Sequence, residues 1–543
     1  MTNALYYGDN LDVLRESIAS ESVDLIYLDP PFNSNANYNV LFRSSAGTGS
    51  RAQIEAFEDT WHWGQEAESA FDGVMRSGNT SAADLLRAMR SFLGENDVMA
   101  YLAMMAVRLL ELHRVLRSTG SLYLHCDPTA SHYLKLLLDA VFGPTNFRNE
   151  VIWKRTGSHG SAKRWGPVHD TVLFYTASET YTWNRLFQPY ESGYVEDKYR
   201  LRDARGLFQD VSLTGPGVRR GDSGLPWKTN NPTLKGRHWA IPGGLINGLE
   251  EATSQEKLDA LEAANLLYFP KNGGGFPRLK QYVGAGLPIQ DVVTDISAVN
   301  SQAQERLGYP TQKPVEFLER ILKASSNPGD IILDPFCGCG TTIHAAQKLG
   351  RPWIGIDVTH LAIGLIERRL KDAFPAIAFD VHGTPQDMDG ARDLARRDKY
   401  QFQWWAVSLI DAQPYGGKKK GADGGIDGLI YFRSDVKTTE RAVVSVKGGG
   451  VSVPMVRDLK GVLDREKAPI GVFLTLEQPT RPMEKEAASA GFYTLGERQY
   501  PRLQIITIEQ ALNGVKPAIP LIDTGAAFKR AVREKPTTQT TLF

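Results

Sequence analysis

Apolar runs that stop at turn residues recur along the first 175 positions of the chain. Five of the six residues in Val23-Asp24-Leu25-Ile26-Tyr27-Leu28 are apolar or aromatic, which is typical of a buried strand. Strands that alternate with helices predict an α/β fold with a mostly parallel sheet and helices on both faces. Further strands are predicted at 5–7, 121–125 and 171–175, and helices over about 102–116, ended by Gly120, and over 132–142.

The same alternation returns after position 309. Pro314 precedes a predicted helix, and a strand at 331–333 leads into Asp334 and a glycine turn. A helix over 343–349 and a strand at 353–356 follow, and Asp357 ends that strand. This order of strand, glycine turn, helix, strand and acid predicts a nucleoside-binding unit at the carboxyl edge of the sheet.

Two stretches lack a clear period. Residues 43–95 are rich in Gly, Ser, Ala and charge, and we expect a surface excursion that closes over a substrate. Residues 176–300 interleave Trp183, Trp227 and Trp239 with lysines and arginines. That mixture suits contact with nucleic acid, and it is equally compatible with a solvated insertion.

The composition narrows the class of protein without identifying it. The 543 residues allow roughly three or four domains, and the zero formal net charge argues against a global field that attracts nucleic acid. Three cysteines are too few for a disulfide framework. No apolar run reaches the length of a membrane span, and the first residues lack a signal-peptide pattern, so we expect a cytoplasmic protein without a membrane partner.

The first candidate for chemistry is Asp29-Pro30-Pro31-Phe32, directly after the strand at 23–28. The two prolines fix φ and stiffen the turn, so the Asp29 carboxylate, the Pro30 carbonyl and the Phe32 ring are presented rigidly. In open α/β sheets, ligands bind at the carboxyl ends of strands. Two acceptors beside an aromatic ring suit a flat heterocycle that bears an amino group.

The second candidate is the glycine turn after Asp334. Gly338 and Gly340 let the backbone approach a ligand, and Asp357 lies about 20 residues further on, where an acid reaches ribose hydroxyls. A dinucleotide site would have a third glycine at position 343, where this chain has Ile. A nicotinamide-dependent oxidoreductase is therefore only a remote alternative.

These segments together resemble the β-class DNA methyltransferases, which methylate adenine N6 or cytosine N4. The resemblance is carried by Asp29 to Phe32, the turn at Asp9, Tyr309 to Pro314, and Asp334 to Gly340, and it covers residues 1 to about 387. In the β class the catalytic strand comes first, the recognition region lies in the middle, and the cofactor loop comes last, which is the order in this chain. It implies a Rossmann-like domain with permuted motifs that uses S-adenosylmethionine on double-stranded DNA.

The resemblance also implies roles for single residues. Asp29, Pro30, Pro31 and Phe32 would be catalytic, and because Asp at the first position is usual in adenine enzymes, the target would be the N6 amine of a flipped adenine. Cytosine N4 is the alternative. The implied cofactor residues are Asp334, Pro335, Phe336, Gly338, Gly340 and Thr341 in the loop, Asp357 at the ribose, Asp9 at the adenine, and Thr311, Lys313 and Pro314 beside the methionine.

The last part of the chain resembles the Mrr-like branch of the PD-(D/E)xK restriction nucleases. Two adjacent strands are predicted, one within 423–432, which contains Asp427, and one at 442–447, which ends at Lys447. The resemblance implies that Asp427 binds a divalent metal, Mg²⁺, and that Lys447 assists the attacking water. Ser445 stands where this family has an acid or Gln, so a fold kept for DNA binding alone is the competing interpretation.

The predicted domains are a methyltransferase domain at 1–387, with its recognition region at about 176–300, a linker at 388–400, a nuclease-like domain at 401–525 and a tail at 526–543. A fusion of these two activities fits restriction-modification or phage defence. A homodimer and a partner subunit are both compatible with that role.

Overall fold

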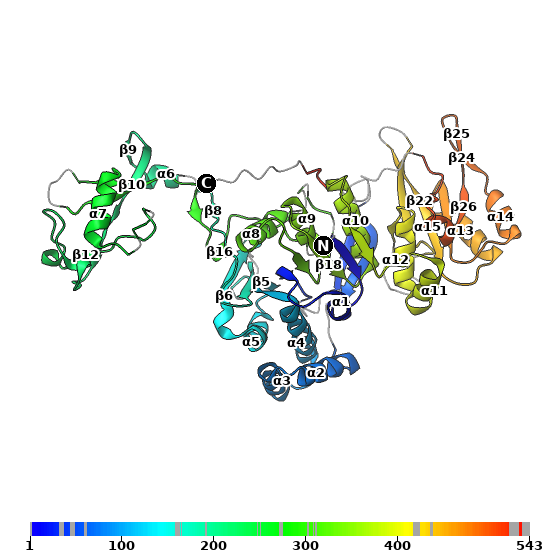
Figure 1. Cartoon of the computed structure of the whole chain (residues 1–543). Coiled ribbons are helices and arrows are strands. Elements are labelled where there is room, and N and C mark those ends of the chain that lie inside the picture. Colours follow the sequence, from blue (N-terminus) through cyan, green and yellow to red (C-terminus); the bar gives the residue numbers. More distant parts are fainter. Residues whose placement is uncertain are drawn as a thin grey trace. The chain divides into compact units, whose positions relative to one another are not determined.

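The computed structural model describes most of the chain (Figure 1). Two of the described segments, 37–43 and 49–58, are described as backbone only. The described residues are 3–31, 37–43, 49–58, 62–157, 163, 165–190, 193–246, 248–249, 251–270, 275–300, 303, 305–307, 309, 312–415, 424–434, 438–520 and 531–534. By contacts they form two units, one of 1–184 with 291–543 and one of Arg185–Gln290.

A nine-stranded, mostly parallel sheet forms the centre of the first unit in its described part. The pairs that β7 makes with β5 and with β6 are antiparallel, and the other pairs are parallel. This sheet confirms the predicted α/β class. In spatial order its strands are β16 (Val292–Val293), β6 (Phe147–Lys154), β7 (His169–Thr176), β5 (Leu116–Cys126), β2 (Val23–Leu28), β17 (Ile332–Asp334), β18 (Trp353–Asp357), β1 (Ala4–Tyr7) and β19 (Asp380–His382).

The register of the four central strands decides where the functional segments meet. Leu333 pairs with Ile26 across β17 and β2, and Tyr7 pairs with Asp357 across β1 and β18. Because these strands are parallel, the segments that follow them emerge at one edge of the sheet. Segments more than three hundred positions apart in sequence are thereby brought to the same edge.

Successive residues of these strands face opposite sides of the sheet and build two cores. Ile26 and Leu333 pack on one side and Leu25 and Ile332 on the other. Helices α1 (Asn10–Ser17), α2 (Gln65–Arg76), α3 (Thr80–Leu93), α4 (Asp97–Val115) and α5 (Ser131–Phe142) cover the first side, and α8 (Val315–Ser325), α9 (Thr341–Lys348) and α10 (His360–Ala373) cover the second.

Two expectations about the first part of the chain were wrong. Most of 62–95 is not a surface excursion, because α2 and α3 bury Phe71, Val74 and Leu86 in the core beside α4. Gly120 does not end the helix, which stops at Val115; it lies inside the long strand β5. Apolar spacing predicted α4 but placed its end too late, because the turn after α4 is made without a glycine. Residues 37–43 and 49–58 form the hairpin β3 (Asn37–Arg43) and β4 (Gly49–Glu58).

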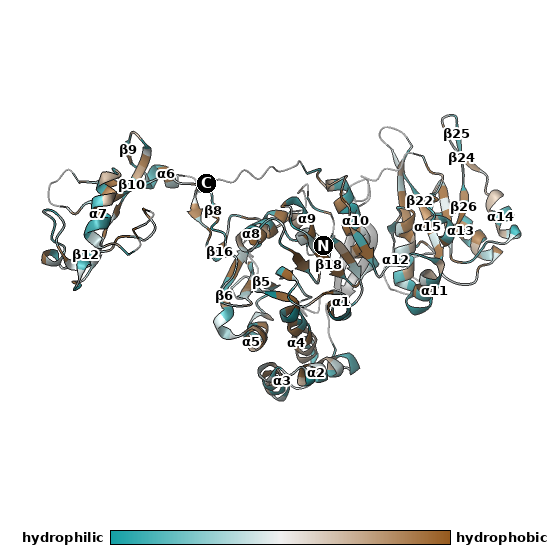
Figure 2. Cartoon of the chain, viewed as in Figure 1, coloured by the Kyte–Doolittle hydropathy of each residue, from teal (hydrophilic) through white to brown (hydrophobic). Residues whose placement is uncertain are grey.

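The unit Arg185–Gln290 has a small core of its own, around Trp227 and Trp239. Both rings are 3% exposed, so they are not the nucleic-acid contacts that the sequence suggested. Polar residues run along the outside of α7 (Figure 2). The unit contains β8 (Phe187–Gln188), α6 (Tyr194–Lys198), β9 (Leu201–Asp203), β10 (Gly206–Ser212), β11 (Thr214–Pro216), β12 (Arg237–Trp239), α7 (Ser254–Ala263), β13 (Leu267–Tyr268), β14 (Arg278–Tyr282), β15 (Leu287–Pro288) and the 3₁₀ turns Asp222–Gly224 and Thr233–Lys235.

The C-terminal part of the first unit is a second α/β layer built on the order β20-β21-β22-β23-β26. One face packs on α11, α12 and α15 and the other on α13 and α14. The elements are α11 (Met388–Arg397), α12 (Lys399–Leu409), β20 (Gln413–Pro414), β21 (Gly428–Arg433), β22 (Thr439–Lys447), α13 (Val453–Glu466), β23 (Ile470–Thr475), α14 (Arg481–Ala488), the hairpin β24 (Phe492–Leu495) and β25 (Arg498–Pro501), β26 (Leu503–Thr507) and α15 (Ile508–Leu512).

The stretch 388–400 is not an extended linker. It forms α11 and the start of α12, and Ala391 and Leu394 are buried in the core of the C-terminal layer. Its charged residues, which suggested a joint, lie on the outer face of α11. Among the described helices, none is long and apolar enough to cross a membrane.

Candidate active site

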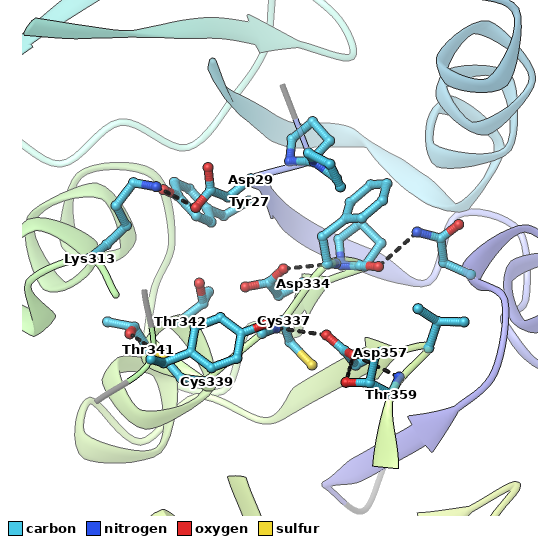
Figure 3. A pocket seen from close by; sticks show the side chains of 18 of the residues that line it. Tyr27, Asp29, Lys313, Asp334, Cys337, Cys339, Thr341, Thr342, Asp357 and Thr359 are labelled. Carbon is cyan, nitrogen blue, oxygen red and sulfur yellow. Dashed lines mark hydrogen bonds and ion pairs between the residues drawn. The ribbon is translucent and has the colours of Figure 1, made fainter. Parts of the chain in front are cut away.

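A pocket of about 280 Å³ lies at the carboxyl edge of the central strands (Figure 3). Asp29 after β2 and Gly338 after β17 line this same pocket. Its volume is near the lower end of the range for ligand pockets, ~300–1,000 Å³. Its other lining residues include Gly8, Asp9, Asn10, Tyr27, Pro30, Pro31, Arg108, Tyr309, Lys313, Asp334, Pro335, Phe336, Cys339, Thr341, Asp357, Val358 and Thr359.

Asp29 is held by a lysine from the other half of the pocket. Lys313 Nζ lies 2.5 Å from Asp29 Oδ2, and both side chains are mostly buried. Figure 3 shows the two side chains pointing toward each other across the pocket wall. The ion pair holds one oxygen of the Asp29 carboxylate, and the Pro30-Pro31 turn holds the backbone beside it rigid.

A buried polar chain lies beneath this pair. Tyr27 Oη is 2.8 Å from His125 Nδ1, and His125 Nε2 is 3.1 Å from Asp170 Oδ2. Burial lowers the pKa of His125. Burial also raises the pKa of Tyr27 well above 10, so the Tyr27 and His125 side chains are both neutral and support the strand that carries Asp29.

The glycine turn has the backbone that the sequence predicted. Gly338 and Gly340 have φ of 49° and 73°, in the left-handed region that favours glycine. A Cβ on Gly340 would lie 2.8 Å from Cγ1 of Ile366, and one on Gly338 would lie 3.3 Å from the Tyr309 ring. The turn is therefore packed as tightly as its glycines allow, and its backbone borders the pocket directly.

Asp357 ties the glycine turn to the next strand. Its Oδ2 accepts from Gly338 N at 2.9 Å, and its Oδ1 accepts from the Thr359 amide and hydroxyl. Burial raises the pKa of Asp357 to about 6, against the hydrogen bonds that lower it.

Asp334 is the most perturbed carboxyl in the pocket. Its Oδ1 accepts from Phe336 N at 3.1 Å, and Thr342 also donates to it. Burial outweighs these bonds and raises its pKa to about 7. A cation placed beside Asp334 would favour the ionised form of its carboxyl. A pocket carboxyl with such a strongly shifted pKa is a candidate for ligand binding.

Residues that the sequence did not single out complete the pocket. Arg108 donates to both oxygens of Asp9 and, at 2.6 Å, to Asn10 Oδ1, and Asn10 Nδ2 donates to Pro335 O at 2.8 Å. A lone arginine in the apolar run of α4 was the available signal, because a buried arginine needs partners. Asp9 is also the N-cap of α1, where its Oδ1 accepts from the Leu11 N–H.

The other predicted cofactor residues are placed as follows. Pro335, Phe336 and Thr341 line the pocket, and Lys313 lines it on the Asp29 side. Pro314 is the N-cap of α8 and is not among the lining residues described. Phe32 and Thr311 lie outside the described residues, so their roles stay predictions.

Family comparison decides the class of protein. Residues 23–368 match the DNA methylase family of N6 and N4 enzymes. The chain belongs to this DNA methylase family. Residues 394–499 of the methylase also match a restriction endonuclease family of the Mrr type, so both resemblances read from the sequence are confirmed, and an oxidoreductase is excluded.

Two sequence relatives agree with this assignment. The type II methyltransferase M.EcaI of Enterobacter cloacae is 30% identical over 373 residues, 68% of this chain and 69% of that enzyme. The type III StyLTI Mod subunit of Salmonella typhimurium is 28% identical over 361 residues, 64% of this chain and 50% of that subunit. Among solved structures, a putative DNA modification methylase from Thermus thermophilus, complexed with S-adenosyl-L-methionine, matches at 15% identity over 70% of this chain and 97% of that one, with a TM-score of 0.34.

The pocket of the methylase fits S-adenosylmethionine in its chemistry. Gly338 and Gly340 let Tyr309 and Ile366 pack against the turn, and the backbone of the turn borders the pocket. Asp334 and Asp357 supply carboxylates for a cationic group and for hydroxyls. Nothing in this donor set calls for a pyrophosphate.

The nuclease-like centre is less complete. Asp427 lies just before β21, with Oδ1 accepting from Gln403 Nε2 at 3.0 Å and Oδ2 accepting from Val446 N at 2.7 Å and from Ser445 Oγ at 3.3 Å. Lys447 ends β22. Asp427 is the one acidic side chain among these donors, and the described residues contain no group of three or more His, Cys, Asp or Glu that could hold a metal ion. Proteins bind Mg²⁺ through one or two carboxylates and water, so Asp427 is the residue that would hold it here.

This donor set predicts that the nuclease-like domain does not cut DNA. We expect plasmid incubated with Mg²⁺ to stay intact with the wild type and with Asp427→Ala alike, because one hydrogen-bonded carboxylate and a serine cannot replace two acidic ligands. Agarose gels of supercoiled plasmid over a range of Mg²⁺ and Mn²⁺ concentrations measure it. Nicked or linear DNA with the wild type only would contradict the prediction.

Proposed function

We propose that this methylase transfers the methyl group of S-adenosylmethionine to the N6 amine of a flipped adenine at a specific site in double-stranded DNA. The observation that carries the proposal is the single pocket lined by Asp29 on one side and by the Gly338 turn on the other. A methyl donor on the glycine turn and an amine beside Asp29 would meet within it. Holding two reactants in such a geometry supplies much of the rate of a two-substrate transfer.

Asp29 and Pro30 would orient the target amine. An exocyclic amine conjugated into a purine is a weak nucleophile, and reaching it requires flipping the base, at a cost of a few kcal/mol. The Asp29 carboxylate and the Pro30 carbonyl would accept hydrogen bonds from the NH₂ group, which raises electron density on nitrogen and directs its lone pair. Lys313 keeps Asp29 in place during this step through the ion pair described above.

The cofactor supplies an electrophilic methyl group on a sulfonium. Asp334 would face its cationic methionine end, the backbone of Gly338 and Gly340 would border it, and Asp357 would accept from a ribose hydroxyl. Asp9 would stand at the adenine end, held by Arg108. These assignments follow the family resemblance at each position.

The unit Arg185–Gln290 would carry the DNA recognition surface. It lies within the stretch 176–300, and Arg219, Arg220 and Lys235 are exposed on it. Lys280 pairs with Asp203, Arg278 pairs with Asp210, and Lys235 lies over the Phe276 ring, all within the unit. The exposed cations suit phosphate contacts, which position a protein on DNA without reading its sequence.

The choice of base is tested in cells. We expect DNA from cells that express the protein to contain N6-methyladenine in one short sequence context, because Asp29 occupies the position that favours adenine in this family. Nucleoside mass spectrometry identifies the product, and sequencing of modified positions gives the context. Cells that express Asp29→Ala are the control, and N4-methylcytosine in place of N6-methyladenine would contradict the choice of base while leaving the methylase intact.

The fused Mrr-type domain fits a role in restriction-modification or phage defence. One relative is named as a Mod subunit of a type III enzyme, which works as part of a larger assembly by its name. A partner subunit would then supply DNA cleavage. Purification of the tagged protein from its host would recover such a subunit if one exists.

A further inference from the structure

Helix α12 belongs to the C-terminal layer but lies beside α10 (Figure 1). It is outside the DNA methylase match, which ends at residue 368, and inside the Mrr-type match. Phe402 and Trp405 on this helix are buried in the core of the C-terminal layer. Two further buried side chains of α12, Gln401 and Trp404, contact a different set of neighbours.

Gln401 satisfies the start of α10. Its Oε1 accepts from the backbone N–H of His360 at 3.0 Å, in a buried position. His360 directly follows Val358 and Thr359, which line the pocket, and its ring stacks on Tyr7 with 3.7 Å between centroids. The first backbone amides of a helix have no acceptor within the helix. Gln401 supplies this acceptor for His360, from outside the residues that match the methylase family.

Trp404 packs behind the glycine turn. It is 5% exposed and belongs to a buried cluster with Leu307, Tyr309, Cys339, Leu361 and Leu365. Tyr309 and Cys339 both line the pocket, and the Tyr309 ring lies against Gly338. A side chain from the C-terminal layer thus backs the pocket wall on the side of the glycine turn.

We propose that Gln401 and Trp404 are positioning residues of the cofactor site, so that the Mrr-type layer completes the S-adenosylmethionine pocket of the methylase. Neither residue touches the pocket; Gln401 acts through the 357–360 turn, and Trp404 acts through Tyr309 and Cys339. The inference rests on the proposed function only in naming the ligand. It assigns a role in methyl transfer to a domain whose own metal centre is incomplete.

The chain offers a matched control on the same helix. Gln403 lies two residues from Gln401, but its Nε2 donates to Asp427 Oδ1 on the far side of α12. Gln403→Leu and Gln401→Leu therefore remove the same amide from one helix, and only Gln401→Leu leaves the His360 N–H without its acceptor. Gln401→Glu keeps an acceptor oxygen at a helix N-terminus, where a negative charge is favourable.

The experiment is a calorimetric titration of the full-length variants with S-adenosylmethionine, joined to steady-state kinetics on DNA. We expect Gln401→Leu and Trp404→Ala to raise the Kd and the KM for the cofactor about five- to tenfold or more, with kcat at saturating cofactor nearly unchanged. Gln401→Glu and Gln403→Leu should bind as the wild type does. A role in folding alone would lower the melting temperature without this split between KM and kcat.

The outcomes separate the two proposals. Folded Gln401→Leu and Trp404→Ala proteins that bind the cofactor with wild-type affinity would overturn this inference and leave the proposed function standing. An equal loss of affinity in Gln403→Leu would also overturn it, because the effect would then come from the layer as a whole. A wild-type protein that does not bind S-adenosylmethionine would instead overturn the proposed function.

Discussion

Asp29→Asn should lower kcat for DNA methylation by about 10³-fold, within the range for losing a positioned base or oriented acceptor. Asparagine keeps the size of the side chain, but it loses the charge that pairs with Lys313 and presents an NH₂ group where the target amine needs an acceptor. Initial rates with labelled S-adenosylmethionine and a DNA duplex that contains the site measure the effect. Binding of the cofactor alone should change much less.

A matched control for this substitution lies on the same strand. Asp24→Asn makes the same chemical change five residues earlier, at the opposite end of β2. Asp24 pairs with Arg117, which is 45% exposed, and its Oδ2 accepts from Ile331 N, a bond that an asparagine oxygen can still accept. A half-exposed ion pair contributes little, so Asp24→Asn should retain most of the activity. An Asp29→Asn enzyme with more than a tenth of wild-type kcat would remove Asp29 from its proposed role.

The affinity for S-adenosylmethionine should tighten about tenfold between pH 6 and pH 8. Burial raises the pKa of Asp334 to about 7, so the carboxyl is mostly neutral at pH 6 and mostly ionised at pH 8. A cationic ligand prefers the ionised form, so binding at pH 6 must expel a proton, and one pKa unit corresponds to a tenfold change. Calorimetry at several pH values in two buffers of different ionisation enthalpy measures both the affinity and the proton release.

Asp334→Asn isolates this carboxyl from the other titrating groups. The amide cannot ionise, so binding should weaken roughly 10- to 100-fold at pH 8, the loss expected for a charged hydrogen-bonding partner. The pH dependence that remains belongs to Asp357, whose pKa is about 6, and to the ligand's own amine. Identical pH profiles for the wild type and Asp334→Asn would show that Asp334 does not face the cation.

The structure of the site also explains a feature of the sequence that had no obvious purpose. Arg108 interrupts the apolar run of α4, and its guanidinium is 4% exposed. It binds Asp9 and Asn10, and Asn10 holds the Pro335 carbonyl at the start of the glycine turn. This one buried charge therefore joins three segments around the pocket: helix α4, the Asp9–Asn10 turn and the start of the glycine turn.

Most elements could be predicted from the sequence alone. The period of apolar positions and the turn residues predicted β2, β17, β18, α5 and α9. The buried face of a strand or helix follows from the local spacing of its apolar residues. The glycines at 338 and 340 could be predicted for the same reason, since a positive φ is a local demand of the backbone. The order of the motifs was enough to indicate a DNA methylase.

Only the tertiary structure decided which of these residues meet. Lys313 was expected beside the cofactor, yet it pairs with Asp29, 284 positions away. The stretch expected to be a linker became α11 and the start of α12, and α12 placed Trp404 and Gln401 behind the cofactor pocket. Spacing along a chain shows that a side chain is buried, but the partner it is buried against depends on strand order and helix packing, which no local pattern records.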